Sequence, residues 1–144
     1  MTIAELRKRS NAFVSSLSGT IAGIVDNNEE LKELNRQQLR SSQLSNGQQI
    51  SRPYAAGYAF WKQKYFASSY GDGKPNMLLT GQLYDKMKIE ARGNNYLIQS
   101  AVAYSGALIA KFGNIFGIAP DNRTKAQLIT TKKLSELYKK NVTK

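Results

Sequence analysis

The residues best suited to chemistry lie between positions 48 and 70, where aromatic and basic side chains are interleaved. Four aromatic residues recur at helical spacing: Tyr54, Tyr58, Trp61 and Tyr65. Three basic residues lie in the same stretch: Arg52, Lys62 and Lys64. Aromatic rings flanked by cations can stack on nucleic-acid bases and bind phosphates, but Tyr, Trp and Arg are also enriched at subunit interfaces. We interpret the four aromatic residues as core or as a candidate subunit interface, and nucleic-acid binding is the alternative.

The lysines of the C-terminal segment form a second group. From Asp121 onward the sequence has seven basic residues against two acidic ones. Four of them are candidate polyanion contacts: Lys132, Lys133, Lys139 and Lys140. Lysines in a last helical turn also stabilise the helix dipole, so a structural role stays open. The formal net charge of +11 favours a polyanionic partner, but it does not choose between nucleic acid, an anionic membrane and an acidic protein surface.

Catalytic chemistry has few candidate residues. The 144 residues include no histidine and no cysteine, which excludes Ser-His-Asp triads, thiolate nucleophiles, disulfides and most zinc sites. Only ten acidic residues are present, and no carboxylate pair stands out for glycoside hydrolysis, so a small basic hydrolase ranks last. The 71–75 loop lacks the Gly-Lys-Ser/Thr ending of a phosphate-binding loop. We predict a protein that is not an enzyme and that uses no cofactor and no metal.

The order of the helices and strands expected from the sequence indicates an α+β fold in one domain, 1–144. Its N-terminal part, 1–45, is predicted to be helical. Thr2 and Glu5 have capping-box spacing, which marks the start of the first helix. Asp26 and Glu29 repeat this spacing, so Asp26 is the predicted start of the second helix.

The middle part, 46–118, combines the aromatic segment with a predicted antiparallel hairpin over 84–101. Apolar and charged residues alternate in its first strand, Gly93-Asn94-Asn95 supplies the turn, and 96–102 returns. The last part, 119–144, is a basic helix for which Asp121 is the predicted N-cap. No segment approaches the roughly 20 apolar residues of a membrane-spanning helix, and the basic start lacks an apolar run typical of a signal peptide. We therefore expect cytoplasmic synthesis and no membrane partner.

Two short runs carry a resemblance to a known family. Residues 75–84 read Pro-Asn-Met-Leu-Leu-Thr-Gly-Gln-Leu-Tyr, in which Thr80-Gly81 precedes the predicted hairpin. Residues 110–118 read Ala-Lys-Phe-Gly-Asn-Ile-Phe-Gly-Ile and precede the last helix. Their order resembles the head-tail connector, tail-completion and minor tail proteins of tailed bacteriophages. Gly81 is expected to adopt an unusual backbone angle in a turn, with Thr80 bonding locally.

The resemblance implies a structural protein of the virion that forms a homo-oligomeric ring at the neck or tail end. Its implied partners are further copies of itself, the portal, connector or tail-tube proteins, and genomic DNA in nonspecific contact. Because the 71–75 loop and the chain ends are long and polar, ordering them costs entropy that a partner must offset. We therefore expect the 71–79 loop and the residues beyond about 138 to be the least ordered parts of an isolated subunit and to be buried in the assembled particle. The alternative, from charge and aromatic content alone, is a sequence-nonspecific nucleic-acid-binding protein.

Overall fold

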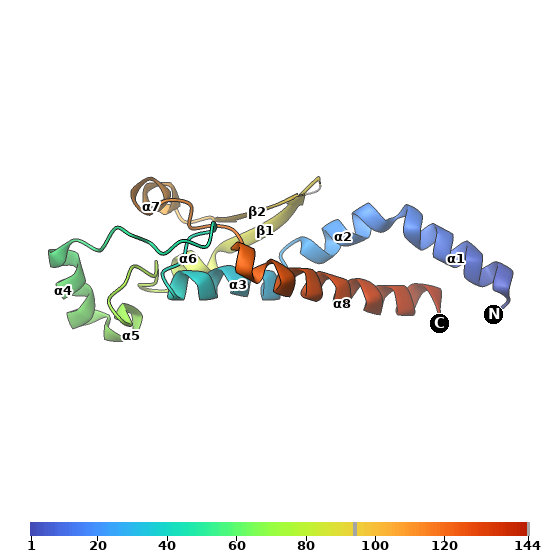
Figure 1. Ribbon diagram of the computed structural model, residues 1–144, viewed down its shortest axis with the longest axis horizontal. Helices are drawn as coiled ribbons and strands as arrows, with labels where there is room; N and C mark the ends of the chain where they lie inside the picture. Colours follow the sequence, from blue (N-terminus) through green and yellow to red (C-terminus); the bar gives the residue numbers. More distant parts are fainter. Residues whose placement is uncertain (94, 144) are drawn as a thin grey trace.

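The computed structural model describes residues 1–93 and 95–143, which form an elongated molecule with helices at both ends (Figure 1). A hairpin lies near the middle, and the arrangement confirms the predicted α+β fold with N-terminal helices, a central antiparallel hairpin and a C-terminal helix. In chain order the elements are α1 (Ile3–Ser15), α2 (Leu17–Val25), α3 (Glu29–Arg40), α4 (Ala56–Tyr65), α5 (Ala67–Tyr70), α6 (Gln82–Asp85), β1 (Met87–Arg92), β2 (Asn95–Ser100), α7 (Ser105–Phe112), the 3₁₀ turn Pro120–Asn122 and α8 (Arg123–Val142).

The first helix has the predicted N-terminus. The Thr2 hydroxyl accepts a hydrogen bond from the Glu5 amide at 3.1 Å, and the Glu5 carboxylate accepts one from the Thr2 amide at 2.6 Å. This reciprocal pair satisfies two of the amides that an α-helix leaves unpaired at its start. The capping box of α1 is therefore confirmed.

The start of α3 corrects the second prediction. The N-cap is Asn28, whose side-chain oxygen accepts from the Leu31 amide at 3.0 Å. Asp26 lies two residues earlier, and its carboxylate instead accepts from the Ala91 amide of β1 at 2.8 Å. The capping-box spacing at Asp26 was misleading, because a strand distant in sequence takes up this carboxylate.

The hydrophobic core lies where α3 packs against the hairpin and the segment that follows α7. Leucines on one face of α3 meet the inward side chains of the two strands and the 115–118 segment. The core residues of these parts are Leu31, Leu34, Leu39, Met87, Ile89, Ile98, Ile115, Phe116 and Ile118. The strands alternate buried and exposed positions because successive side chains point to opposite faces of a strand.

Two buried amides on α3 hold the irregular 115–119 segment. Asn35 donates to the Ile115 carbonyl at 2.9 Å and accepts from the Gly117 amide at 2.9 Å. Gln38 donates to the Gly117 carbonyl at 2.8 Å and accepts from the Ala119 amide at 2.8 Å. The two side chains therefore replace the hydrogen bonds that a neighbouring strand would give this apolar segment.

The last helix starts later than predicted. Pro120 opens a 3₁₀ turn, and α8 begins at Arg123. Asp121 does not cap α8; its carboxylate lies 3.5 Å from the side-chain nitrogen of Gln43. From there α8 runs antiparallel to α1 and α2 and packs against both (Figure 1).

Candidate interaction surfaces

One end of the molecule carries a continuous row of aromatic side chains along α4 and the residues before it. We call Tyr54, Tyr58, Trp61 and Tyr65 the aromatic ladder. Successive ring centroids in this ladder lie 5.0, 5.8 and 6.2 Å apart. Tyr54 is half-buried and packs on Phe112 of α7, whereas Tyr65 at the other end of the ladder is 62% exposed. The four residues singled out by their spacing therefore do lie together, and three of them are exposed to solvent.

A buried lysine positions the ladder. The Lys62 side chain is fully buried, and its ammonium donates to the Tyr54 hydroxyl at 3.0 Å and to the Asn76 side-chain oxygen at 2.8 Å. Asn76 is itself anchored through its amide nitrogen, which donates to the Ser69 carbonyl at 2.9 Å. The sequence places Lys62 among the basic residues that could bind phosphates. This prediction is wrong, because the ammonium group of Lys62 is buried and faces the interior. We call Lys62, Tyr54, Asn76 and Ser69 the lysine network.

The lysine network also orders the second half of the 71–79 loop, which the sequence predicts to be poorly ordered in an isolated subunit. Pro75, Asn76 and Met77 are buried, and the Tyr84 hydroxyl donates to the Asn76 carbonyl at 2.5 Å. Burial raises the pKa of the Tyr84 hydroxyl far above its usual value. Only the start of the 71–79 loop is exposed, so its second half belongs to the packed structure of an isolated chain.

Gly81 has the conformation expected of it, and Thr80 does not have its expected hydrogen bond. Gly81 has φ +89°, the left-handed region that favours glycine, and it leads directly into α6. Among the described residues the Thr80 side chain makes no hydrogen bond, and it points to solvent. The turn therefore depends on the glycine.

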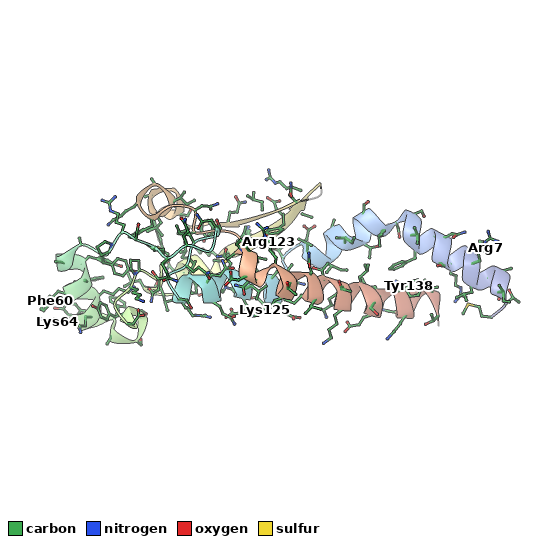
Figure 2. The ribbon with its side chains drawn as sticks, in the orientation of Figure 1. Arg7, Phe60, Lys64, Arg123, Lys125 and Tyr138 are labelled. Atoms are coloured by element: carbon green, nitrogen blue, oxygen red, sulfur yellow. The ribbon has the colours of Figure 1, made fainter. Side chains whose placement is uncertain are left out.

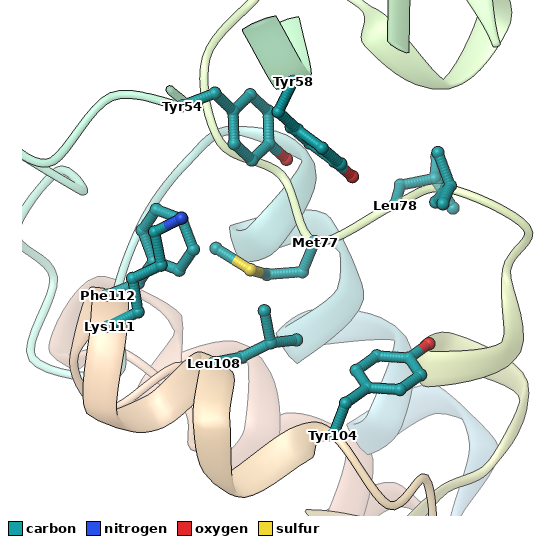
Figure 3. A pocket seen from close by; sticks show the side chains of 9 residues that line it. Tyr54, Tyr58, Met77, Leu78, Tyr104, Leu108, Lys111 and Phe112 are labelled. Carbon is teal, nitrogen blue, oxygen red and sulfur yellow. The ribbon is translucent and has the colours of Figure 1, made fainter. Parts of the chain in front are cut away.

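An apolar cavity of about 340 Å³ opens beside the buried end of the ladder (Figure 3). Its walls come from the ladder, from the 77–79 segment and from α7, and include Tyr58, Met77, Leu78, Tyr104 and Leu108. Burial is also the main cause that raises the pKa of Tyr58. The cavity is continuous with the exposed rings and enlarges the apolar surface at this end.

The other end of the molecule is strongly basic. We call α1, α2 and α8 together the basic arm; it carries nine basic residues against two acidic ones. Arg7 lies on α1, and Arg123 and Lys125 lie on the first turn of α8 (Figure 2). Lys125, Lys132 and Lys139 are all exposed and recur every seven residues, so they follow one side of α8. At 1.5 Å per residue they are about 10 Å apart.

The four lysines predicted to contact a polyanion divide between two positions. Lys132 and Lys139 belong to the exposed row just described. Lys133 and Lys140 instead border a shallow cavity between α8 and the α2–α3 region, where the Lys133 ammonium lies 3.7 Å from the Glu136 carboxylate. Lys125 was not among the predicted contacts, and its seven-residue spacing to Lys132 is the signal that indicates it.

Within the basic arm, α1 is the least buried helix. Phe13 and Tyr138 meet edge to face with ring centroids 5.3 Å apart, and the hydroxyls of Ser10 and Tyr138 are 3.5 Å apart. No residue of α1 is buried, and Ile3 is 86% exposed. In Figure 1 the first turns of α1 extend past the C-terminal end of α8. The apolar side of α1 is therefore largely uncovered in the single chain.

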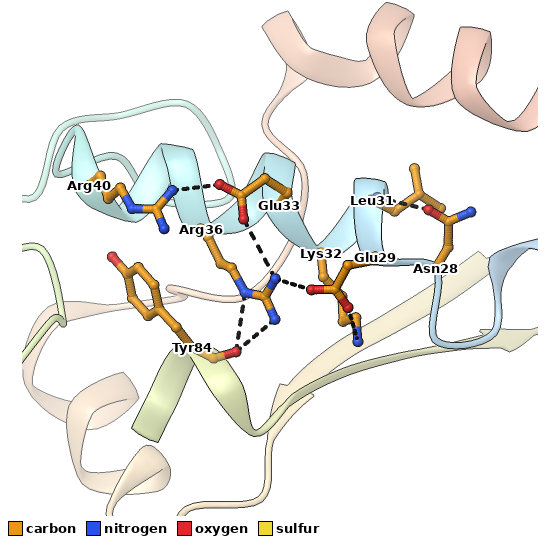
Figure 4. Close-up of polar contacts among 8 residues, drawn as sticks. All are labelled: Asn28, Glu29, Leu31, Lys32, Glu33, Arg36, Arg40 and Tyr84. Atoms are coloured by element: carbon orange, nitrogen blue, oxygen red, sulfur yellow. Dashed lines mark hydrogen bonds and ion pairs between the residues drawn. The ribbon is translucent and has the colours of Figure 1, made fainter. Parts of the chain in front are cut away.

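Between the two ends, a charged cluster joins α3 to α6 (Figure 4). Arg36 donates to the Tyr84 carbonyl at 2.9 and 3.1 Å and pairs with the carboxylates of Glu29 and Glu33. Hydrogen bonds from Arg36 and then Lys32 lower the pKa of Glu29 to about 2. The cluster therefore uses two carboxylates, those of Glu29 and Glu33, to hold Arg36 and Arg40 in place.

No family model, curated protein or solved structure matches this chain. Within residues 1–93 and 95–143, no three His, Cys, Asp or Glu side chains are grouped so that they could hold a metal ion. In the same residues no helix is both long enough and apolar enough to cross a membrane.

Proposed function

We propose that this chain is a structural subunit of a tailed-bacteriophage virion that forms a homo-oligomeric ring at the head-tail connector or the tail end. The observation that carries the proposal is the presence of two different exposed apolar surfaces at opposite ends of an elongated molecule. The aromatic ladder lies at one end, and the uncovered side of α1 lies at the other (Figure 1). Two unlike surfaces on one subunit are what a head-to-tail contact requires, and such contacts generate a ring when the rotation between neighbouring subunits closes.

The composition of the ladder supports an interface role. Exposed Tyr and Trp bury large areas at low conformational cost and are enriched where subunits meet. The lysine network holds the ladder in place before any partner arrives, which lowers the entropy cost of association. Portal, connector or tail-tube proteins are the proposed neighbours, and the virion is the proposed location.

The basic arm gives the subunit a surface for the DNA that passes through a connector. Contacts from lysines to phosphates need no base recognition. We expect weak, salt-sensitive binding with a Kd of roughly 10⁻⁴ to 10⁻⁶ M at physiological salt. The proposal assigns the chain no catalytic role and no cofactor.

Copy number in purified particles tests the proposal. Quantitative mass spectrometry should find several copies of the chain per virion, and a single copy or none would overturn it. In particles assembled with the double substitution Trp61→Ala and Tyr65→Ala, incorporation should fall. Phe60→Ala is the matched control, because Phe60 is 68% exposed on the same helix but lies off the ladder.

The second candidate is a sequence-nonspecific nucleic-acid-binding protein, which the charge of the basic arm favours. It predicts a Kd for random-sequence DNA well below a micromolar and no dependence of particle assembly on the ladder. Virion copy number and DNA affinity therefore separate the two functions.

A further inference from the structure

The outer edges of the two hairpin strands differ in whether other parts of the chain form hydrogen bonds with them. On the outer edge of β1, the Ile89 carbonyl accepts from the Asn27 amide at 2.8 Å, and the Ala91 amide donates to Asp26 at 2.8 Å. The chain between α2 and α3 therefore covers this edge. Natural proteins cover or charge such edges because a free one pairs with other strands.

The register shows which groups β2 presents on its own outer edge. Ile89 pairs with Ile98, and Ala91 pairs with Tyr96. In an antiparallel ladder, two residues in a non-hydrogen-bonded pair point their backbone groups away from each other. Since Ile89 and Ala91 point outward, Ile98 and Tyr96 also point their amides and carbonyls outward, on the opposite side.

These outward groups have no partner within residues 1–93 and 95–143: no hydrogen bond reaches the backbone of Tyr96 or Ile98 from outside the hairpin. Figure 1 shows no helix or strand along this side of β2 between α7 and the hairpin tip. An open groove of about 430 Å³ borders the strand, with Ile109 and Phe116 among its lining residues. The edge is open, and apolar surface lies beside it.

The sequence around β2 lacks the usual protection. Between Arg92 and Lys111 there is no charged residue and no proline, in a chain that is 22% charged. Edge lysines, prolines and bulges are the common devices against strand pairing. If β2 of a second copy lies beside β2 of the first, no charged side chain of either strand is at the contact. The electrostatic repulsion between two molecules of net charge +11 is therefore weakest at this edge.

We propose that β2 pairs in antiparallel fashion with β2 of a second copy, about a twofold axis at Ile98. The hairpins then form a four-stranded sheet in which Ile98 meets its own copy and Tyr96 faces Ser100. The outward amides and carbonyls of Tyr96 and Ile98 gain partners, and the Ser100 carbonyl, which accepts from the Ser105 hydroxyl at 3.4 Å, keeps a second lone pair for the amide of Tyr96. The contact uses the same surface on both molecules. It does not depend on the ring assembly, whose contacts lie at the two ends of the subunit.

Sedimentation equilibrium of the full chain tests this pairing. We expect a reversible dimer whose association strengthens from 0.15 M to 1 M NaCl, because salt screens the repulsion between two like-charged molecules around an uncharged contact. Tyr96→Pro removes an outward amide from each copy while leaving the β1–β2 bonds intact. It should weaken association by about tenfold or more. Tyr96→Ala keeps the amide and removes the ring, so it should retain the dimer.

A peptide experiment covers the case in which Tyr96→Pro fails to fold. A capped synthetic peptide with the sequence of residues 95–101 should dissociate the dimer, and the same peptide with an N-methyl group on Ile98 should not. Four outcomes overturn the proposal: a monomer at about millimolar concentration, a dimer indifferent to both Tyr96→Pro and the peptide, a dimer that weakens as salt rises, or a monomer that binds the peptide. The last would assign the edge to a strand from a different protein.

Discussion

The aromatic end and the basic arm both expose apolar side chains, but they are attached to the body of the molecule in different ways. The aromatic ladder is fixed by the lysine network, in which Lys62 is fully buried and hydrogen-bonded to side chains from two other segments. In the basic arm, α1 has no buried residue and meets α8 through the edge-to-face pair of Phe13 and Tyr138. A buried polar network has few alternative arrangements, whereas a thin apolar contact permits local opening.

This difference matches the two kinds of contact that we propose. A subunit interface benefits from side chains that are already placed, because ordering them during association costs free energy. A phosphate-binding surface needs charge density more than fixed geometry. The aromatic end therefore offers a preplaced surface for a subunit contact. The basic arm combines the apolar side of α1, the other half of that contact, with the lysine row of α8 for a polyanion.

The largest expected effect comes from breaking the lysine network. Asn76→Leu removes the side-chain oxygen that accepts from Lys62 and leaves a buried ammonium with one fewer partner. We expect the free energy of unfolding in urea to fall by about 3–5 kcal/mol. Asn76→Asp is the control, since it keeps an oxygen at this position and should lose less. A wild-type urea midpoint for Asn76→Leu would show that the ladder is held in some other way.

The second effect concerns DNA. Replacing Lys125, Lys132 and Lys139 with Gln should weaken binding of random-sequence duplex DNA by about tenfold or more at low salt. Fluorescence anisotropy should show the slope of log K against log salt reduced by about 2 to 3, because three phosphate contacts are lost. The triple variant Lys64→Gln, Lys86→Gln and Lys88→Gln makes the same change in net charge outside the arm. Equal losses in both variants would mean that only total charge matters.

A smaller effect is expected from loosening the arm itself. Phe13→Ala removes the ring that meets Tyr138, and because Phe13 is only partly buried we expect a loss of about 1–2 kcal/mol. Hydrogen exchange should locate the loss in α1 and leave the amides of α3 protected. Val14→Ala, at a position 62% exposed, should change stability by less than about 0.5 kcal/mol. Loss of protection throughout the molecule would contradict the local attachment of the arm.

The smallest effect is the pH dependence of the charged cluster on α3. The pKa of Glu29 is lowered to about 2 from an ordinary value near 4.5, so its contribution is present above about pH 4.5 and is lost as pH falls toward 2. Because the Glu29 side chain is 68% exposed, solvent screening limits this contribution to about 0.2–1 kcal/mol. Urea unfolding at pH 6 and pH 3 should show a smaller pH effect in Glu29→Gln than in wild type. An unchanged pH effect would assign the acid sensitivity to other carboxylates.

Local patterns predicted those features that depend on neighbouring residues. The capping box at Thr2 and Glu5 was found from spacing alone, because its two partners are three residues apart. The hairpin was found from alternation, although β2 ends at Ser100 instead of reaching 102, and Asn94 of the predicted turn lies outside the described residues. Helical spacing also placed the four aromatic residues of the ladder together.

Features that depend on distant residues were decided only by the tertiary structure. Lys62 and Asp26 read as an exposed cation and a helix cap, but Asn76 and Ala91 give them other roles. Asn35 and Gln38 read as polar residues on α3, and about 80 positions later the chain supplies the backbone groups that they bind. A buried polar group must find a partner wherever the chain passes. Local patterns therefore fix which elements form, and packing fixes which polar side chains are turned inward.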